Sequence, residues 1–286
     1  MAPGNHPGNY TQGYSQQTLS SHLLRTAETD AAFLLPHIKK HHKVLDVGCG
    51  PGTISLGFVK YASEGTTVGI DISAEVLEKA KSMAAEAEIL NTGPGSISFE
   101  AGDILSGLSY ADNSFDIVYC GQVLGYFVES PDLPVQALTE MRRVLKPGGI
   151  LATRTGAEQH FYPRSFDLDR LWVRNFERAV YKGVVPAVDS VGNSMPGLFR
   201  KAGFDLEIGG IHVSAGTTVY STPEARKWLA LRGTSQLQPG DAFHQSWLDA
   251  DITNEEIEQT LKAVAEWAEH DGAWFVALHC DVLGWK

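Results

Sequence analysis

Three glycines alternate in the segment Asp46-Val47-Gly48-Cys49-Gly50-Pro51-Gly52, directly after an apolar, strand-like run that begins at Val44. Glycine permits positive φ and lets a ligand approach the backbone closely. In open α/β sheets, ligands bind beyond the carboxyl ends of the strands, where this segment would lie. The pattern therefore predicts a loop that holds a cofactor.

Two classes of cofactor fit a glycine loop of this kind. A nicotinamide enzyme favours G-x-G-x-x-G with a pyrophosphate at the helix N-terminus, but the third glycine position holds Thr53. Asp46, two positions before the first glycine, would sit badly beside a pyrophosphate. A carboxylate suits a cationic ligand with an amino group, so the segment favours S-adenosyl-L-methionine.

Further candidates for cofactor binding follow the next three expected strands. Asp71 closes the second strand, where its carboxylate can accept hydrogen bonds from both ribose hydroxyls, although it could instead help to cap the next helix. Asp103 could bind the adenine amino group or be an ordinary turn aspartate. The predicted cofactor-binding residues are thus Asp46, Gly48, Cys49, Gly50, Gly52, Asp71, Ile72, Asp103, Ile104 and Gln122, the last lying where the backbone should turn close to the methyl group.

The elements that must position these residues alternate along the chain. Strand-like apolar runs and helical patterns alternate from Val44 onward, which is typical of an α/β fold with a mostly parallel sheet. We expect strands at 44–47, 67–71, 96–100, 115–120, 150–155, 205–213 and 273–278. We expect helices at 53–61, 74–90, 135–145, 166–181, 195–202, 223–232 and 253–270, and further helical spacing at 18–38.

Composition limits the class of protein. The chain has 286 residues, a formal net charge of −11 and three widely spaced cysteines. The acidic balance argues against nucleic acid as a partner, and the cysteine spacing argues against a metal site and indicates a reducing compartment. Neither a signal peptide nor about 18 uninterrupted apolar residues is found, so we expect a cytoplasmic protein with no membrane partner. The oligomeric state is left open.

Four segments resemble the motifs of class I S-adenosylmethionine-dependent methyltransferases, in the ubiquinone/menaquinone-biosynthesis-like group. They are Val44–Thr53, Phe115–Val118, Gln122–Leu124 and Arg142–Gly149. Residues 10–14, 25–28 and 274–279 also recur in that group, so the similarity spans nearly the whole chain. It implies a Rossmann-like seven-stranded sheet, mostly parallel with the last strand antiparallel, plus N-terminal helices and a helical cap.

The same resemblance implies roles for the N-terminal segment and a division of the chain. Arg25 would pair with the cofactor carboxylate, while Tyr10 and Tyr14 on a flap would close over the methionine portion, although the tyrosines could equally anchor a loose terminus. The expected parts are an N-terminal flap with helices (1–42), the Rossmann-like core (43–157, 196–216 and 273–286) and a helical cap over the acceptor pocket (158–195 and 217–272).

The acceptor is harder to predict. The N-terminal half is more narrowly similar to fungal gliotoxin bis-thiomethyltransferases, which S-methylate reduced gliotoxin, whereas residues 156–162 depart from the acidic pattern usual in bacterial relatives. Aromatic residues in the segments expected to cap the crevice favour a mostly apolar pocket for a small molecule, although such residues are more often lid core. The predicted substrate-binding residues are Phe127, Tyr162, Trp172, Phe243 and His244.

No catalytic residue can be assigned from the sequence. Methyl transfer is an in-line displacement that depends mainly on holding acceptor and methyl group in position. A thiol needs little help from a base, whereas a phenol benefits from one. The favoured interpretation is therefore S-methylation of a dithiol secondary metabolite. The alternatives are C- or O-methylation of a quinol or phenolic metabolite, a cofactor-binding regulator that has lost transfer, and a nicotinamide dehydrogenase.

Overall fold

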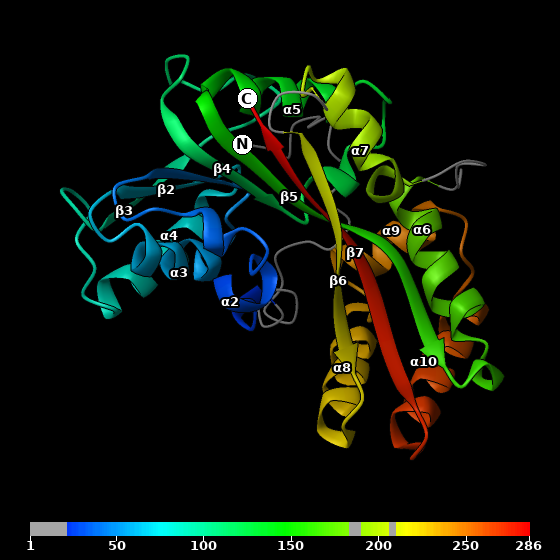
Figure 1. Cartoon of the computed structure of the whole chain (residues 1–286). Helices are drawn as coiled ribbons and strands as arrows, with labels where there is room; N and C mark the ends of the chain where they lie inside the picture. Colours follow the sequence, from blue (N-terminus) through cyan, green and yellow to red (C-terminus); the bar gives the residue numbers. More distant parts are fainter. Residues whose placement is uncertain (1–21, 183–189, 206–209) are drawn as a thin grey trace. The chain divides into compact units, whose positions relative to one another are not determined.

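A seven-stranded sheet in the order β3-β2-β1-β4-β5-β7-β6 organises the chain. The computed structural model describes residues 22–182, 190–205 and 210–286. The sheet is mostly parallel with an antiparallel last strand, β7, which runs against β5 (Figure 1). The predicted fold class, including the helices that accompany the sheet, is thereby confirmed.

The first four strands agree with the expected ranges to within one or two residues. They are β1 (Lys43–Val47), β2 (Thr66–Asp71), β3 (Ser96–Ala101) and β4 (Phe115–Gly121). β1 pairs in parallel with both β2 and β4, and β2 pairs in parallel with β3. The carboxyl ends of all four strands therefore meet at one edge of the sheet, as the cofactor prediction requires.

The last three strands are longer than predicted. They are β5 (Leu145–Tyr162), β6 (Ile211–Tyr220) and β7 (Trp274–Trp285). The sequence Lys146-Pro147-Gly148-Gly149, which is typical of a turn, lies within β5, because Gly148 N–H donates to the Lys286 carbonyl and Lys286 N–H donates to the Gly149 carbonyl. A register shift between Phe115 and Ile117 of β4 accommodates the extra residues. The strand predicted at 205–213 lies further along the chain, and residues 206–209 are outside the described part.

The helices agree with the expected positions more closely than with the expected lengths. They are α2 (Ala27–Asp30), α3 (Thr53–Tyr61), α4 (Ala74–Glu86), α5 (Leu133–Val144), α6 (Asn175–Val180), α7 (Val191–Lys201), α8 (Pro223–Gln236), α9 (Ala242–Asp249) and α10 (Asn254–Glu269). The helix expected at 166–181 is broken into a 3-10 turn η3 (Arg164–Phe166), a π-helical segment η4 (Asp169–Arg174) and α6. α9 was not predicted as a separate helix. It begins at an Asp241 cap that accepts a hydrogen bond from Phe243 N–H.

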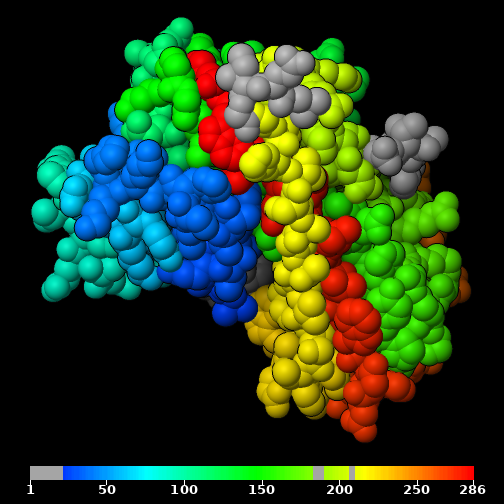
Figure 2. All heavy atoms as spheres, viewed as in Figure 1, coloured from blue at the N-terminus to red at the C-terminus, as the bar shows by residue number. Residues whose placement is uncertain are grey.

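The chain divides into two compact units. Among the described residues, unit 2 comprises 22–155, 191–205, 210–216 and 280–286, and unit 1 comprises 156–182, 190 and 217–279. Each of β5, β6 and β7 thus has residues in both units. Figure 2 shows β6 along the surface of the molecule, in keeping with the exposure of most of its residues.

Unit 2 has a hydrophobic core on each face of its sheet, because side chains alternate along a strand. Val44 of β1 and Ile117 of β4 belong to the cluster that includes Phe58 of α3. Leu45 and Val118 belong to the opposite cluster, with residues of α5 and α7. A side chain at Asp46, two positions after Val44, must therefore point toward α3 rather than toward α5.

Two further properties of the described residues bear on the predictions. The three cysteines are free thiols, with Cys49 and Cys120 buried. None of the helices in the described ranges combines the length and apolar composition that crossing a membrane requires.

Candidate active site

The glycine loop after β1 has the left-handed backbone that only glycine adopts without strain. Gly50 has φ +54° and Gly52 has φ +81°. A Cβ on Gly52 would lie 2.7 Å from the Phe99 ring, whereas among the described residues the nearest atom to a Cβ on Gly50 would be His22 Nδ1, at 3.9 Å. Gly52 is thus required by internal packing. At Gly50 the described residues leave space beside the backbone, which suits a ligand that approaches the loop.

Asp46 does not line this open space. Its side chain is buried, and its Oδ2 accepts a 2.5 Å hydrogen bond from Ser55 Oγ of α3. Burial raises the pKa of Asp46 to about 7, against the opposing effect of the Ser55 hydrogen bond. A nearby cation would favour the ionised form of Asp46. The prediction that Asp46 favours a cationic ligand therefore stays a prediction, but the buried carboxylate could act on such a ligand only from behind the loop, without touching it.

Asp71 joins the loop to the end of β2. Its Oδ2 accepts from Gly50 N–H at 3.0 Å and its Oδ1 accepts from Ser73 N–H at 2.9 Å. Its carbonyl accepts from Gly102 N–H at 3.1 Å, which brings the segment after β3 to the same place. Burial raises the pKa of this carboxyl. Each carboxylate oxygen keeps a second lone pair for a ribose hydroxyl, so the predicted role and the capping role are compatible.

The remaining cofactor candidates differ in exposure. Ile72 is 48% exposed, whereas Ile104 is buried in the core of unit 2 and Cys49 is buried against α4 and β3. Asp103 accepts from Leu105 N–H and from Ser106 Oγ. Of these side chains, Ile72 is thus the one placed to cover a flat ring, and burial raises the pKa of the Cys49 thiol.

The turn after β4 is held by backbone contacts. Gln122 has φ +61°, and its N–H donates to the Arg154 carbonyl at 2.7 Å. Arg25 is half-buried, immediately before the Thr26 cap of α2. Tyr10 and Tyr14 lie outside the described residues, so their roles stay predictions.

A buried ion pair next to this turn was not predicted. Arg154 of β5 and Asp281 of β7 are each about 5% exposed, and Arg154 Nη1 donates to Asp281 Oδ2 at 3.0 Å. Asp30 of α2 lies 4.0 Å from Arg154 Nε. A Cβ at Gly216 of β6 would meet Arg154 Nη1 and Asp281 Oδ2, so a larger residue there would displace the ion pair. The sequence signal that could have revealed this pair is a charged residue in each of two largely apolar strands, Arg154 in β5 and Asp281 in β7.

The predicted substrate residues lie mainly in the interior of their own units. Phe127 is buried in the core of unit 2. In unit 1, Phe243 is 1% exposed and lies 6.1 Å from the Trp172 ring, and His244 is also buried. Tyr162 stacks on Trp274 at 4.6 Å. The substrate role of all five residues stays a prediction.

Unit 1 contains a cavity whose lining residues are mostly polar or charged. His160 Nδ1 lies 2.9 Å from Asp169 Oδ2, and His160 Nε2 lies 3.3 Å from Glu158 Oε2. Burial raises the pKa of Glu177. The cavity is lined by Glu158, Gln159, His160, Asp169, Val173, Arg174 and Glu177.

If the ribose binds at Asp71 as predicted, Asp71→Ala should weaken cofactor binding by about 1 to 3 kcal/mol, because the ribose hydroxyls and the Gly50 N–H would lose their acceptor. Calorimetric titration with S-adenosylhomocysteine measures the change. Ser73→Ala is the matched control, since it removes the hydroxyl that caps α4 and keeps the carboxylate. Equal affinity in wild type and Asp71→Ala would show that the ribose lies elsewhere.

Comparison with known proteins places this arrangement in one family. Residues 38–188 match a family described as methyltransferase domain. The chain is 61% identical to the "Probable methyltransferase ltbC" of Aspergillus luteorubrus over 286 residues, which cover all of both proteins. It is 37% identical to the ubiquinone/menaquinone biosynthesis C-methyltransferase UbiE of Bdellovibrio bacteriovorus over 111 residues, or 39% of this chain and 43% of the relative.

A solved structure shows the same fold. The YcgJ protein from Bacillus subtilis aligns with 90% of this chain and 97% of its own, with a TM-score of 0.57 and 21% sequence identity.

Proposed function

The chain belongs to the S-adenosylmethionine-dependent methyltransferases that carry the methyltransferase domain, and from that premise we propose that it methylates a small molecule, at the sulfur of a dithiol metabolite. Its cofactor is S-adenosyl-L-methionine, so the nicotinamide alternative is set aside. The family and the cofactor were both predicted from the glycine loop and the accompanying motifs.

The observation that supports the cofactor site in this proposal is the convergence of three strand ends in unit 2. Asp71 binds the loop at Gly50, and its own carbonyl binds Gly102, one residue before Asp103. This arrangement supports a ribose at Asp71 and an adenine near Asp103 and Ile72. The open side of Gly50 supports close approach of the methionine portion, whose carboxylate we assign to Arg25.

Held by the Gly50 loop, Asp71 and Arg25, the cofactor would supply an electrophilic methyl group to the acceptor sulfur; the thiol proton would leave to solvent and S-adenosylhomocysteine would remain. The residues of this chain need only hold the reactants and exclude water. Because a thiol is partly ionised near neutral pH, its methylation does not require a base from the protein.

Two observations support a small acceptor. The net charge of −11 disfavours nucleic acid, and the name of the UbiE relative describes methylation in quinone biosynthesis. That name also favours the second candidate function, C- or O-methylation of a quinol or phenolic metabolite. Sulfur remains our first choice because of the resemblance of the N-terminal half to enzymes that methylate reduced gliotoxin.

S-adenosylmethionine with a labelled methyl group should distinguish these acceptors. The full-length protein is incubated separately with reduced gliotoxin and with a matched quinol, and the products are identified by mass spectrometry. Label on the dithiol sulfur supports the proposal, and label on the quinol alone overturns the choice of sulfur. Cofactor binding without transfer to either acceptor would favour the regulatory alternative. The Asp71→Ala variant is the control for transfer that depends on the site.

A further inference from the structure

The loop between β3 and β4, residues 102–114, is held by one face of α5. Gln136, Glu140 and Arg143 follow one another at helical spacing of four and three residues, so they share that face. Gln136 Nε2 donates to the Leu105 carbonyl at 2.8 Å, and Leu108 N–H donates to Glu140 Oε1 at 2.6 Å. The loop is thus tied to the helix at several points along its length.

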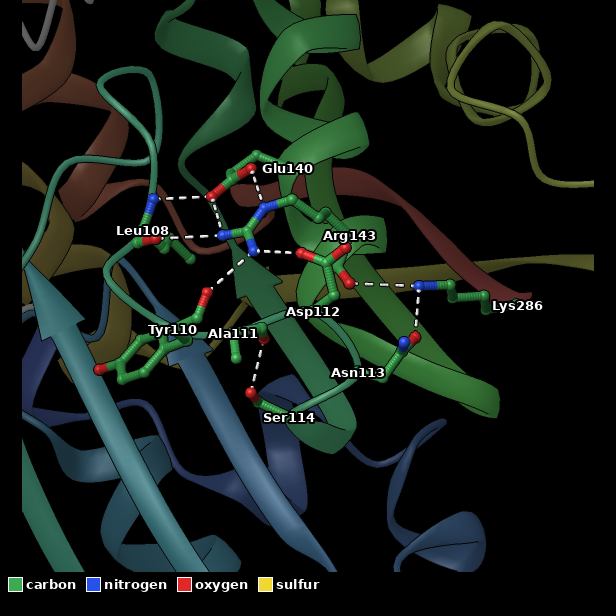
Figure 3. A network of polar contacts seen from close by, with 9 residues as sticks. All are labelled: Leu108, Tyr110, Ala111, Asp112, Asn113, Ser114, Glu140, Arg143 and Lys286. Carbon is green, nitrogen blue, oxygen red and sulfur yellow. Dashed lines mark hydrogen bonds and ion pairs between the residues drawn. The ribbon is translucent and has the colours of Figure 1, made fainter.

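Arg143 is the centre of this arrangement (Figure 3). Its Nε and Nη2 donate to the two carboxylate oxygens of Glu140, at 2.8 and 2.7 Å. The same guanidinium donates to the carbonyls of Leu108 and Tyr110 and to Asp112 Oδ1, at 3.0, 2.8 and 2.7 Å. An arginine side chain has five N–H donors in a fixed planar fork, and all five are used here.

The charges in the network are complementary. The Arg143 side chain is 31% exposed and the Glu140 side chain 16%. The hydrogen bonds that Arg143 donates to Glu140 lower the pKa of Glu140 and raise the pKa of Arg143. Both groups are therefore charged over the whole physiological range, so the hydrogen bonds between them do not depend on pH within that range.

The loop that α5 holds also contains Asp103, the residue assigned to the adenine. Asp103 Oδ1 accepts from Leu105 N–H at 2.9 Å, and Leu105 is the residue whose carbonyl Gln136 holds. We propose that Arg143 is a positioning residue for cofactor selectivity: through Leu108, Tyr110 and Glu140 it fixes the loop that presents the Asp103 carboxylate to the adenine amino group. This inference rests on the proposed placement of the adenine.

A lysine at position 143 keeps the charge but has three donors and no planar fork, so it cannot hold two carbonyls and two carboxylates at once. Arg143→Lys should therefore loosen the loop selectively. Arg142→Lys is the matched control, because the neighbouring Arg142 makes the same change of type while lying over the Phe204 ring instead of the loop.

The experiment compares the binding of S-adenosylhomocysteine with that of S-inosylhomocysteine, in which an oxygen replaces the adenine amino group. The wild type and Arg142→Lys should prefer the adenine compound by about tenfold or more, as expected for a hydrogen bond to a carboxylate. In Arg143→Lys the preference should fall to within about twofold. A merely structural role would weaken both ligands equally and leave their ratio unchanged, which would overturn the inference.

Gln136→Met provides a second variant. It removes the hydrogen bond from the exposed Gln136 side chain of α5 to the Leu105 carbonyl. Gln136→Met should lower the same ratio by a smaller factor than Arg143→Lys does. If the ratio stayed at the wild-type value in each of these two single variants, the proposal that α5 positions the loop would be contradicted. A wild-type ratio near one would overturn the adenine placement itself. Methyl transfer to an acceptor would be unaffected by that result, so failure of the inference and failure of the proposed function are distinguishable.

Discussion

Gly50→Val should abolish measurable cofactor binding while the protein stays folded. Gly50 has φ +54°, where a β-branched residue is strained by about 1 to 2 kcal/mol. The new side chain would also occupy the space beside the loop, where the nearest atom of the described chain to a Cβ is 3.9 Å away. We expect the dissociation constant for S-adenosylhomocysteine to rise at least about a hundredfold, equivalent to about 3 kcal/mol, as measured by calorimetry.

Gly93→Val is the matched control for backbone strain. Gly93 has φ +89°, lies in the loop before β3, and a Cβ there would meet no atom of residues 22–182, 190–205 or 210–286 within 4 Å. The two variants should therefore lose similar stability in thermal unfolding, whereas Gly93→Val keeps the affinity of the wild type. If Gly50→Val bound the cofactor as well as Gly93→Val does, the ligand would not approach the loop at this residue.

Asp281→Ala should lower the free energy of unfolding by about 3 to 5 kcal/mol, because it leaves the buried Arg154 charge without its partner. Both side chains are about 5% exposed, so solvent provides little compensation. Asp30, 4.0 Å from Nε, is too distant to replace the lost hydrogen bond. Denaturant unfolding followed by circular dichroism measures the loss.

The double variant Arg154→Met with Asp281→Leu tests the cause of that loss. Replacing both charges by apolar side chains removes the unpaired charge, so stability should return to near the wild-type value. If the double variant were as unstable as Asp281→Ala, the loss would arise from packing around Gly216 rather than from charge.

The ion pair also carries a pH dependence. Burial raises the pKa of Asp281 to about 6 even though Arg154 lowers it. The folded protein therefore holds this proton more tightly than the unfolded chain, so the extra stability that comes from the protonated carboxyl is lost as the pH rises from about 4 to about 6, while the ionised carboxylate still pairs with Arg154. Relative to Asp281→Asn, the wild type should accordingly be less stable at pH 7 than at pH 4.

The cofactor end of the fold could be predicted because local sequence rules determine it. Alternating glycines after an apolar strand require a turn that no other residue adopts, and Asp71 ends the next strand. The residue types therefore predicted both the elements and their order. What they did not show is that Asp46 points toward Ser55 of α3, because this depends on which face of the sheet the helix covers.

The rest of the chain depends on contacts between distant segments. β5 continues through a Pro-Gly-Gly turn signal because the C-terminal Lys286 pairs with it. The Arg154–Asp281 pair joins residues 127 positions apart. Aromatic residues such as Phe243 have the same sequence signature whether they line a pocket or fill a core, and only the packing of unit 1 shows that Phe243 is buried. No local pattern carries this information.

The division of the chain limits how this enzyme can be taken apart. The described chain passes between the units after residues 155, 190, 216 and 279, so each unit is built from separate stretches of sequence. Neither unit can be produced as a fragment by a single cut or a single stop codon. A chimera with a relative must exchange 156–190 and 217–279 together, joined within β5, β6 and β7. If unit 1 determines acceptor preference, that preference depends on two separate stretches of sequence, 156–190 and 217–279, which must change together.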